Sequence, residues 1–325
     1  MGTDLQSRNT WRGVKMSGLV SILIPARDAE KTVEKAVRSA LSQSYENIEV
    51  VVINDGSNDA TPEILGRLAS EDKRLRIIHT EGRGLSEARN TAVREARGDY
   101  LFFLDADDWI SQDTIEDLQF LIEFLKADLA MTGTVRETMD GRFIDKTDNK
   151  YVGKFLRRDL ETGYTRENGA EYVRIWGKLF RKEVLSSVHF PKGLRHEDVF
   201  VFPDVCANIN SAVVSNRHGY HYIQRDDSIM HKPEDEHTID VVLAACHVFD
   251  RWYADGKYDL LPGAEGKIYA AMQRQPRPRE CPALKNNFAR GKKMHLARVK
   301  KLKKLHLYSF HACLRNSVFY RRPVL

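Results

Sequence analysis

The sequence predicts an α/β fold in which helices cover both faces of a mostly parallel sheet. Between residues 19 and 135, short apolar runs typical of buried strands alternate with segments whose apolar residues recur every three or four positions. This alternation implies strand–helix–strand units, whose right-handed crossovers produce parallel strands. At 325 residues, 42% of them hydrophobic, the chain is long enough to bury such a core.

Five strands can be placed in order in this part of the chain. Each is an apolar run of the length that a buried strand needs. They are expected at "LVSILIPA" (19–26), "IEVVVIND" (48–55), "LRIIHT" (75–80), "DYLFFLD" (99–105) and "DLAMTG" (128–133).

Helices are expected between these strands. One should cover residues 29–41 after Asp28 as a cap, and the next should begin with Thr61 as its cap and Pro62 at its first position, where a missing N–H costs nothing. Two more are expected, at residues 86–97 and at about residues 112–126.

The pattern weakens beyond residue 135. Residues 171–185 suggest a helical or part-helical segment, residues 219–225 a strand and residues 237–254 a strong amphipathic helix. "QRQPRPRECP" (273–282) holds three prolines among charged residues, which is typical of a linker.

Three acidic residues, Asp105, Asp107 and Asp108, follow the apolar strand that ends at Leu104. Like charges this close repel one another, so a D-x-D cluster either retains a proton or binds a cation. Carboxylate oxygens suit Mg²⁺ or Mn²⁺, which bind through one or two carboxylates together with substrate phosphates. The alternative is a solvated turn in which Asp107 or Asp108 caps the next helix.

Longer motifs extend this observation. "VSILIPARDAEKTVEKAVRSALSQSYENIEVVVINDGSNDAT" followed by "GRGLSEARNTAVREARGDYLFFLDADDWI" resembles the nucleotide-sugar-binding half of family 2 inverting glycosyltransferases, which have the GT-A fold. "WGKLFRKEVL", "RHEDVF" and "YHYIQRDDSIM" resemble later blocks of bacterial members that build surface polysaccharides. The resemblance covers roughly residues 19–232, and it implies a Rossmann-like sheet with a helical C-terminal region.

The resemblance divides the chain into segments with different expected roles. A nucleotide-sugar donor would bind the first half of the GT-A domain, and the acceptor would bind the second half. The expected segments are a flexible extension (1–18), the donor half (19–135), the acceptor half (136–232), a helical segment (233–272), and a linker with a basic tail (273–325).

On the nucleoside side, the resemblance implies that Pro25, Ala26 and Arg27 lie against the base and ribose. Asp55 of "NDGS" would accept a hydrogen bond from a uracil ring, which indicates a UDP-linked donor. The residues after Pro25 replace a more usual aromatic–Asn pair, and Asn54 replaces a common Asp. These departures affect base and sugar specificity rather than the chemistry.

On the diphosphate side, the resemblance implies that Arg89 faces the phosphates and that Asp105 contacts ribose or metal-bound water. Asp107 would ligate the Mn²⁺ or Mg²⁺ ion, with Asp108 as a reserve ligand. We expect Lys178 of "WGKLF" to neutralise phosphate or acceptor charge.

An inverting transfer needs a base to deprotonate the attacking hydroxyl. "RHEDVF" offers Glu197 and Asp198, and by resemblance Asp198 is the base while Glu197 orients the acceptor or a loop. On spacing alone, the same residues could simply begin a helix. Because the chain lacks the Q-x-x-R-W block of processive synthases, we expect the transfer of one sugar per encounter.

Two other classes of protein remain open from the sequence. A phosphatase or phosphotransferase of the haloacid dehalogenase type would use Asp105 as its nucleophile. A catalytically inactive sugar-nucleotide-binding module is the other. A dinucleotide dehydrogenase is disfavoured because no G-x-G-x-x-G follows the first strand.

Charge distribution suggests where the protein works. Residues 284–325 hold 12 Lys and Arg and no Asp or Glu, so this tail suits the anionic inner face of the plasma membrane. Residues 1–18 lack an apolar signal core, and the four cysteines lack C-x-x-C spacing, so we expect a cytoplasmic protein. The acceptor would be a glycan or lipid-linked glycan, and no nucleic acid is expected.

Overall fold

The computed structural model describes residues 16–147, 153–166, 170–224, 239–273 and 285–305. The chain divides into two compact units. Unit 1 comprises the residues up to Leu156, Ile175–Ser187 and Ile209–Gln224, and unit 2 comprises Arg157–Arg174, Val188–Asn208 and the residues from Arg225 onward. The expected linker lies almost entirely outside the described residues.

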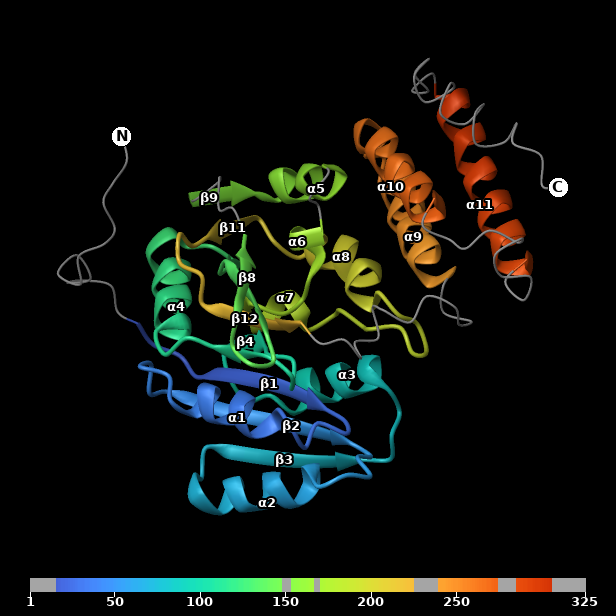
Figure 1. The fold of residues 1–325 in the computed structure, drawn as a ribbon. Helices are drawn as coiled ribbons and strands as arrows, with labels where there is room; N and C mark the ends of the chain where they lie inside the picture. Colours follow the sequence, from blue (N-terminus) through green and yellow to red (C-terminus); the bar gives the residue numbers. More distant parts are fainter. Residues whose placement is uncertain (1–15, 148–152, 167–169, 225–238, 274–284, 306–325) are drawn as a thin grey trace. The chain divides into compact units, whose positions relative to one another are not determined.

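Unit 1 is built on an eight-stranded sheet with the order β3-β2-β1-β4-β10-β6-β11-β9 (Figure 1). The first four strands in this order are mutually parallel, as the predicted crossovers require. The strands are β1 (Val20–Ala26), β2 (Ile48–Asp55), β3 (Leu75–Thr80), β4 (Tyr100–Phe103), β6 (Leu129–Met131), β9 (Gly153–Leu156), β10 (Lys178–Arg181) and β11 (Ser211–Val214).

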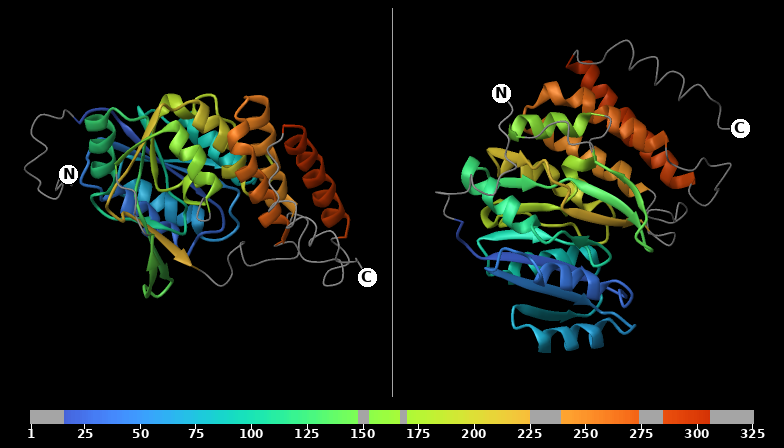
Figure 2. Two further views of the ribbon diagram at one scale, coloured as in Figure 1. Left: turned by 90° about the horizontal axis from the view of Figure 1, so that it is seen from above. Right: turned by 60° about the vertical axis from the view of Figure 1, so that its left-hand side comes forward.

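A smaller sheet of unit 1 has the order β5-β12-β7-β8. Its strands β7 and β8 are green and β12 is yellow in the two views of Figure 2. Strand β12 lies between β5, to which it is antiparallel, and β7, to which it is parallel. Because β5 directly follows the acidic cluster, this pairing brings residues 220–224 close to that cluster. The strands are β5 (Trp109–Ile110), β7 (Thr134–Thr138), β8 (Phe143–Lys146) and β12 (Tyr220–Gln224).

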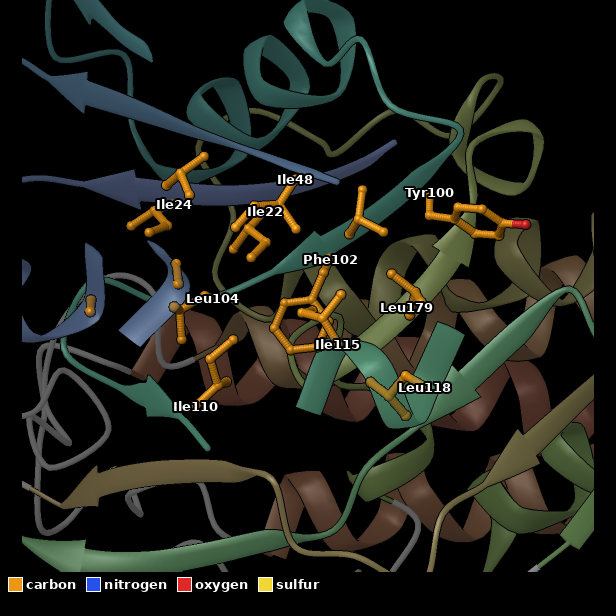
Figure 3. Close-up of a cluster of buried hydrophobic side chains, with 14 of the residues drawn as sticks. Ile22, Ile24, Ile48, Tyr100, Phe102, Leu104, Ile110, Ile115, Leu118 and Leu179 are labelled. Carbon is orange, nitrogen blue, oxygen red and sulfur yellow. The ribbon is translucent and has the colours of Figure 1, made fainter. Parts of the chain in front are cut away.

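Helices cover both faces of the large sheet. Alternating residues of the fully buried strand β1 point to opposite faces. Ile22 and Ile24 join the core formed with α1, α2 and α4, while α3 packs against β1 and β2 (Figures 1 and 3). The helices of unit 1 are α1 (Val33–Leu41), α2 (Thr61–Glu71), α3 (Leu85–Glu95), α4 (Thr114–Leu125) and α7 (Lys182–Leu185).

Unit 2 is helical in its described residues. Helix α10 packs on α9 and α11, and α8 packs on α9. The predicted helix at residues 237–254 is present as α9, with Val242, Cys246, Phe249 and Trp252 buried. The helices are α5 (Arg157–Thr165), α6 (Ala170–Val173), α8 (Glu197–Ala207), α9 (Asp240–Ala254), α10 (Leu261–Gln273) and α11 (Lys285–Lys304), with a 3₁₀ turn η4 (Tyr258–Leu260).

The prediction of a helical or part-helical segment at residues 171–185 is partly confirmed: α6 and α7 overlap its two ends, but strand β10 lies between them, antiparallel to both β4 and β6. The two predicted helix caps were wrong. The cap position of α1 belongs to Thr32 rather than to Asp28. Thr61 is not the cap of α2, because the cap position belongs to Ala60 and the Thr61 hydroxyl accepts a hydrogen bond from the Ala29 N–H at 2.8 Å.

No helix in the described part of the chain is long and apolar enough to cross a membrane. In α11, Val299 and Leu302 are buried whereas Leu296 is 39% exposed.

Candidate active site

The carboxyl ends of β1, β2 and β4 meet at one edge of the large sheet. The parallel register pairs Ala26 with Asn54 and Leu23 with Phe103. Ligands bind at this edge in open α/β sheets because the loops leaving parallel strands converge there. The predicted residues that follow these strands therefore leave the sheet at the same edge.

Asp55, at the end of β2, is buried and accepts three hydrogen bonds. The Thr80 hydroxyl donates to Oδ1 at 2.6 Å, the Arg83 N–H donates to Oδ1 at 2.8 Å, and the Gly84 N–H donates to Oδ2 at 2.7 Å. Burial alone would raise the pKa of Asp55, but these bonds and the nearby Arg27 charge lower it below its ordinary value. Asp55 is therefore an ionised group that fixes the loop after β3.

The loops after β2 and β3 touch directly. A Cβ on Gly56 would lie 2.7 Å from the Gly82 nitrogen, and Gly56 has a φ of +68°, so this position requires glycine. Arg27, half exposed, lies beside Gly82. These contacts place Arg27 and Asp55 on neighbouring loops.

Asn54, which departs from the family pattern, makes hydrogen bonds within the protein. Its Oδ1 accepts hydrogen bonds from the N–H and hydroxyl of Ser57, and its amide nitrogen lies 3.0 Å from His79 Nδ1. An amide suits this position because its oxygen accepts hydrogen bonds from Ser57 while its NH₂ group can donate to the His79 ring nitrogen.

Arg89, on α3, forms an ion pair with Asp105. Its Nη2 lies 3.1 Å from Asp105 Oδ1, and the side chains of Arg89 and Asp105 are 4% and 24% exposed. The guanidinium thus brings a buried positive charge to the D-x-D turn.

Asp105 to Asp108 form a tight turn that Tyr220 of β12 holds. The Asp108 N–H donates to the Asp105 carbonyl oxygen at 3.1 Å. The Tyr220 hydroxyl accepts from the Asp105 N–H at 3.2 Å and donates to Asp108 Oδ2 at 2.7 Å, and the Ile223 N–H donates to Asp108 Oδ1 at 2.8 Å. Both carboxylate oxygens of Asp108 are therefore engaged within the protein.

The burial of Asp108 favours the uncharged form of its carboxyl group. It is 2% exposed, and burial together with the charges of Asp107 and Asp105 raises the pKa of its carboxyl well above the ordinary value. The predicted reserve ligand thus faces β12, whereas Asp105 and Asp107 are partly exposed.

The donor set at this turn fits a divalent ion that a substrate completes. Among the described residues, no cluster of three or more His, Cys, Asp or Glu side chains forms a metal cage. Mg²⁺ and Mn²⁺ sites that bind diphosphates need only one or two protein carboxylates, since phosphate oxygens and water complete the coordination. Asp107, with Asp105 beside it, satisfies this requirement.

Lys178 begins β10 and is 4% exposed. Because β10 is antiparallel to β4 and Leu179 pairs with Phe102, Lys178 lies at the carboxyl end of β4. The preceding Trp176 stacks on Tyr220, with ring centroids 4.4 Å apart. Lys178 therefore lies at the same sheet edge as the acidic turn, and its neighbour Trp176 packs on Tyr220.

Glu197 and Asp198 lie in the first turn of α8, in unit 2. Glu197 is 7% exposed, and Asp198 Oδ1 accepts a hydrogen bond from the Val199 N–H at 2.8 Å. His196 precedes the helix with a φ of +61°, a conformation that ends the incoming loop sharply. Acidic residues at a helix N-terminus are stabilised as carboxylates by the helix dipole.

A model of the family described as "Glycosyl transferase family 2" matches residues 21–187, which is 167 of the 325 residues of the chain. The chain belongs to this family. Membership of a glycosyltransferase family argues against the phosphatase alternative with Asp105 as nucleophile.

Curated relatives carry matching names. Glycosyltransferase GlyA of Streptococcus pneumoniae is 31% identical over 216 residues, covering 65% of this chain and 31% of GlyA. Glycosyltransferase GlyG of the same organism is 28% identical, covering 66% of this chain and 74% of GlyG. Chondroitin synthase of Pasteurella multocida is 41% identical over 190 residues, covering 57% of this chain and 19% of the synthase. The chain thus spans a third or less of GlyA and of the synthase.

A solved structure has the same fold. Residues 1–349 of S. aureus TarS, in complex with UDP-GlcNAc, align with a TM-score of 0.64 at 18% identity, covering 89% of this chain and 92% of that chain. The predicted GT-A class of fold is confirmed.

Some residues of the transferase site could not be found from the sequence. Tyr220 and Thr80 hold Asp108 and Asp55, yet they are 112 and 25 residues away from them in the chain. The aromatic "YHY" pattern predicted only a strand. The proposed roles of the site residues stay predictions.

Proposed function

We propose that this transferase moves a sugar from a UDP-linked donor to an acceptor hydroxyl, with inversion. The observation that carries this proposal is the geometry of Asp55. A carboxylate has about four lone-pair sites, and protein donors use three of those of Asp55. The remaining site suits the N–H of a uracil ring, and Pro25, Ala26 and Arg27 would contact base and ribose. The UDP-GlcNAc complex of TarS supports the choice of donor.

Asp107 would hold Mn²⁺ or Mg²⁺ against the diphosphate, with Asp105 toward ribose or metal-bound water. When bound, such an ion neutralises the charge that develops on the departing diphosphate. Arg89 and Lys178 contribute fixed positive charges at the same sheet edge. A buried guanidinium stabilises phosphate oxygens more than an exposed one, because less water screens its charge.

Asp198 would act as the base that takes the proton of the acceptor hydroxyl, and Glu197 would orient the acceptor. An ionised carboxylate within about 3 Å of the hydroxyl can accept its proton as the new glycosidic bond forms. The sugar would be attacked on the face opposite the diphosphate, so its configuration inverts. Each encounter would add one sugar.

The acceptor would be a glycan or lipid-linked glycan in the synthesis of a surface polysaccharide. The names of the relatives support this class of product. Helix α11 supports a contact with anionic lipid, since its buried face packs on α9 and α10 while Arg290, Lys293 and Lys300 are exposed. The protein would then act in the cytoplasm at the inner face of the plasma membrane.

The direct test is a screen of sugar nucleotides with Mn²⁺, followed by NMR of the product. We expect turnover with one or more UDP-sugars and the opposite anomeric configuration in the product. Asp198→Asn should bind UDP normally and lose transfer, whereas Glu63→Gln on the exposed surface of α2 should behave as the wild type. Retained configuration, or full turnover by Asp198→Asn, would contradict the mechanism.

A further inference from the structure

Two late motifs, "WGKLF" and "YHYIQ", meet beside the acidic turn in unit 1 through the stacked rings of Trp176 and Tyr220. The turn lies 112 residues before Tyr220 in the chain, yet the Tyr220 hydroxyl contacts both of its ends. We propose that Tyr220 is a positioning residue for metal-dependent donor binding: it holds the Asp105–Asp108 turn in the shape that presents Asp107. This inference rests on the proposed function and adds a residue to it.

The hydroxyl of Tyr220 is suited to this task because it donates and accepts at once. It accepts the Asp105 N–H at 3.2 Å and donates to Asp108 Oδ2 at 2.7 Å, so one atom joins the first and last residues of the turn. Asp107 lies between these two fixed points. A turn fixed at both ends does not have to be ordered when the ligand arrives, which saves entropy on binding.

Asp108 provides the second anchor. Its Oδ1 accepts the Ile223 N–H at 2.8 Å, so its side chain contacts β12 at two places. A carboxyl that is 2% exposed would be costly without such bonds. The third aspartate of the motif thus connects the turn to a strand, while its neighbour Asp107 remains partly exposed.

Trp176 fixes the ring of Tyr220 in turn. The two rings stack at 4.4 Å with an interplanar angle of 22°, and Trp176 also stacks on Tyr222 at 5.8 Å. Trp176 forms a bridge with Phe103, the last residue of β4. Stacked aromatic pairs add to the stability gained from burial alone. Tyr220 is fully buried, so its hydroxyl has little freedom to move away from the turn.

Gly177 supplies the backbone conformation between Trp176 and β10. It has a φ of +67°, which residues with a side chain rarely adopt, and it lies against the Tyr220 ring. Its N–H donates to the Phe103 carbonyl oxygen at 3.3 Å. The "WG" pair therefore connects the end of β4 to β12, which explains why a motif far from the D-x-D cluster bears on its geometry.

The test compares UDP binding by calorimetry in the wild type, Tyr220→Phe and Tyr45→Phe. Tyr45 is a matched control, because its buried hydroxyl donates to the Gly18 carbonyl oxygen at 2.7 Å, away from the acidic turn. In EDTA we expect equal UDP affinity for all three proteins. With Mn²⁺, the half-saturating Mn²⁺ concentration should rise about tenfold for Tyr220→Phe, the scale of one lost hydrogen bond to a charged group, and stay unchanged for Tyr45→Phe.

Saturating Mn²⁺ should restore transfer by Tyr220→Phe, a recovery that general destabilisation would not give. Should Tyr220→Phe fail to fold, Trp176→Phe provides a milder change, for which we expect a smaller rise in the Mn²⁺ requirement. An unchanged Mn²⁺ requirement in the folded variant overturns the inference and leaves the proposed function intact. A wild type whose UDP binding ignores Mn²⁺ overturns both.

Discussion

The guanidinium of Arg89 lies 3.1 Å from the carboxylate of Asp105, which connects helix α3 to the acidic turn after β4. The side chain of Arg89 is 4% exposed, so little water solvates its positive charge. The Asp105 carboxylate stabilises that charge, and a bound anion could add to this stabilisation. We therefore expect the same guanidinium to hold the acidic turn and to contact the diphosphate of a bound donor.

We expect Arg89→Gln to lower the free energy of unfolding by about 2 kcal/mol, since it leaves a partly buried carboxylate without its cation. Transfer should fall more than tenfold. Arg94→Gln is the matched control, because Arg94 lies on the same helix with its side chain 66% exposed. Urea denaturation and initial rates measure the two effects, and equal behaviour of the two variants would rule out this role for Arg89.

Asp55→Asn should abolish UDP binding. An amide has one acceptor oxygen, so it cannot serve the donors from Thr80, Arg83 and Gly84 and a uracil N–H together. We also expect the free energy of unfolding to fall by about 1–3 kcal/mol. Thr80→Val removes a single donor and should have a smaller effect on both quantities. Calorimetric titration with UDP decides the matter, and wild-type affinity in Asp55→Asn would refute the assigned contact.

Glu49 should make the protein acid-sensitive. Burial alone would raise its pKa, but hydrogen bonds from Ser21, the Arg97 N–H and Arg76 lower the pKa below its ordinary value. Because the folded state favours the ionised form, this stabilisation is present above the unfolded pKa and is lost as pH falls through the folded pKa.

The Glu49→Gln variant should therefore lose less stability than the wild type when pH falls from about 5 to about 3. It should be less stable than the wild type at pH 7, where the carboxylate is fully ionised. Glu63→Gln, at an exposed position on α2, should follow the wild-type curve. Urea denaturation at each pH gives the comparison, and parallel curves for Glu49→Gln and wild type would exclude this source of acid sensitivity.

Helix α11 should bind anionic vesicles through its outer face. Each basic residue near a phosphatidylserine surface contributes about 1 kcal/mol. Lys293→Glu with Lys300→Glu should therefore weaken vesicle sedimentation at least tenfold at low salt. Lys31→Glu with Lys73→Glu makes the same charge change at exposed positions of unit 1 and should have little effect. Equal losses in the two double variants would indicate net charge rather than a specific face.

The sequence predicted β1 to β4 and the helices between them because each strand is a continuous apolar run and each helix has a regular apolar face. Strand β10 was not predicted, since only Leu179 and Phe180 are apolar between Lys178 and Arg181. Its position between β4 and β6 depends on pairing with distant strands, and the pattern of four residues does not indicate such pairing.

The candidate site, like the fold, was predictable where local sequence patterns decide the structure and not where distant residues do. Asp55 and Asp105 were expected at one sheet edge, because parallel strands end together, whereas Arg89 was expected near the phosphates only from the family resemblance. The arrangement of Asp108 was not predictable, because its partners Tyr220 and Ile223 follow it by more than a hundred residues and contact it only after the second sheet forms. Nearness to Asp107 in sequence suggested metal binding, whereas burial directs Asp108 to β12.

We propose that Asp107 holds a divalent ion against the diphosphate of a bound UDP-sugar. Anomalous diffraction from crystals soaked with UDP and Mn²⁺ tests it most directly. We predict a manganese peak in contact with an Asp107 carboxylate oxygen and both phosphates, absent in Asp107→Asn and present in Glu63→Gln. UDP bound at Asp55 with no manganese beside Asp107 would contradict the account.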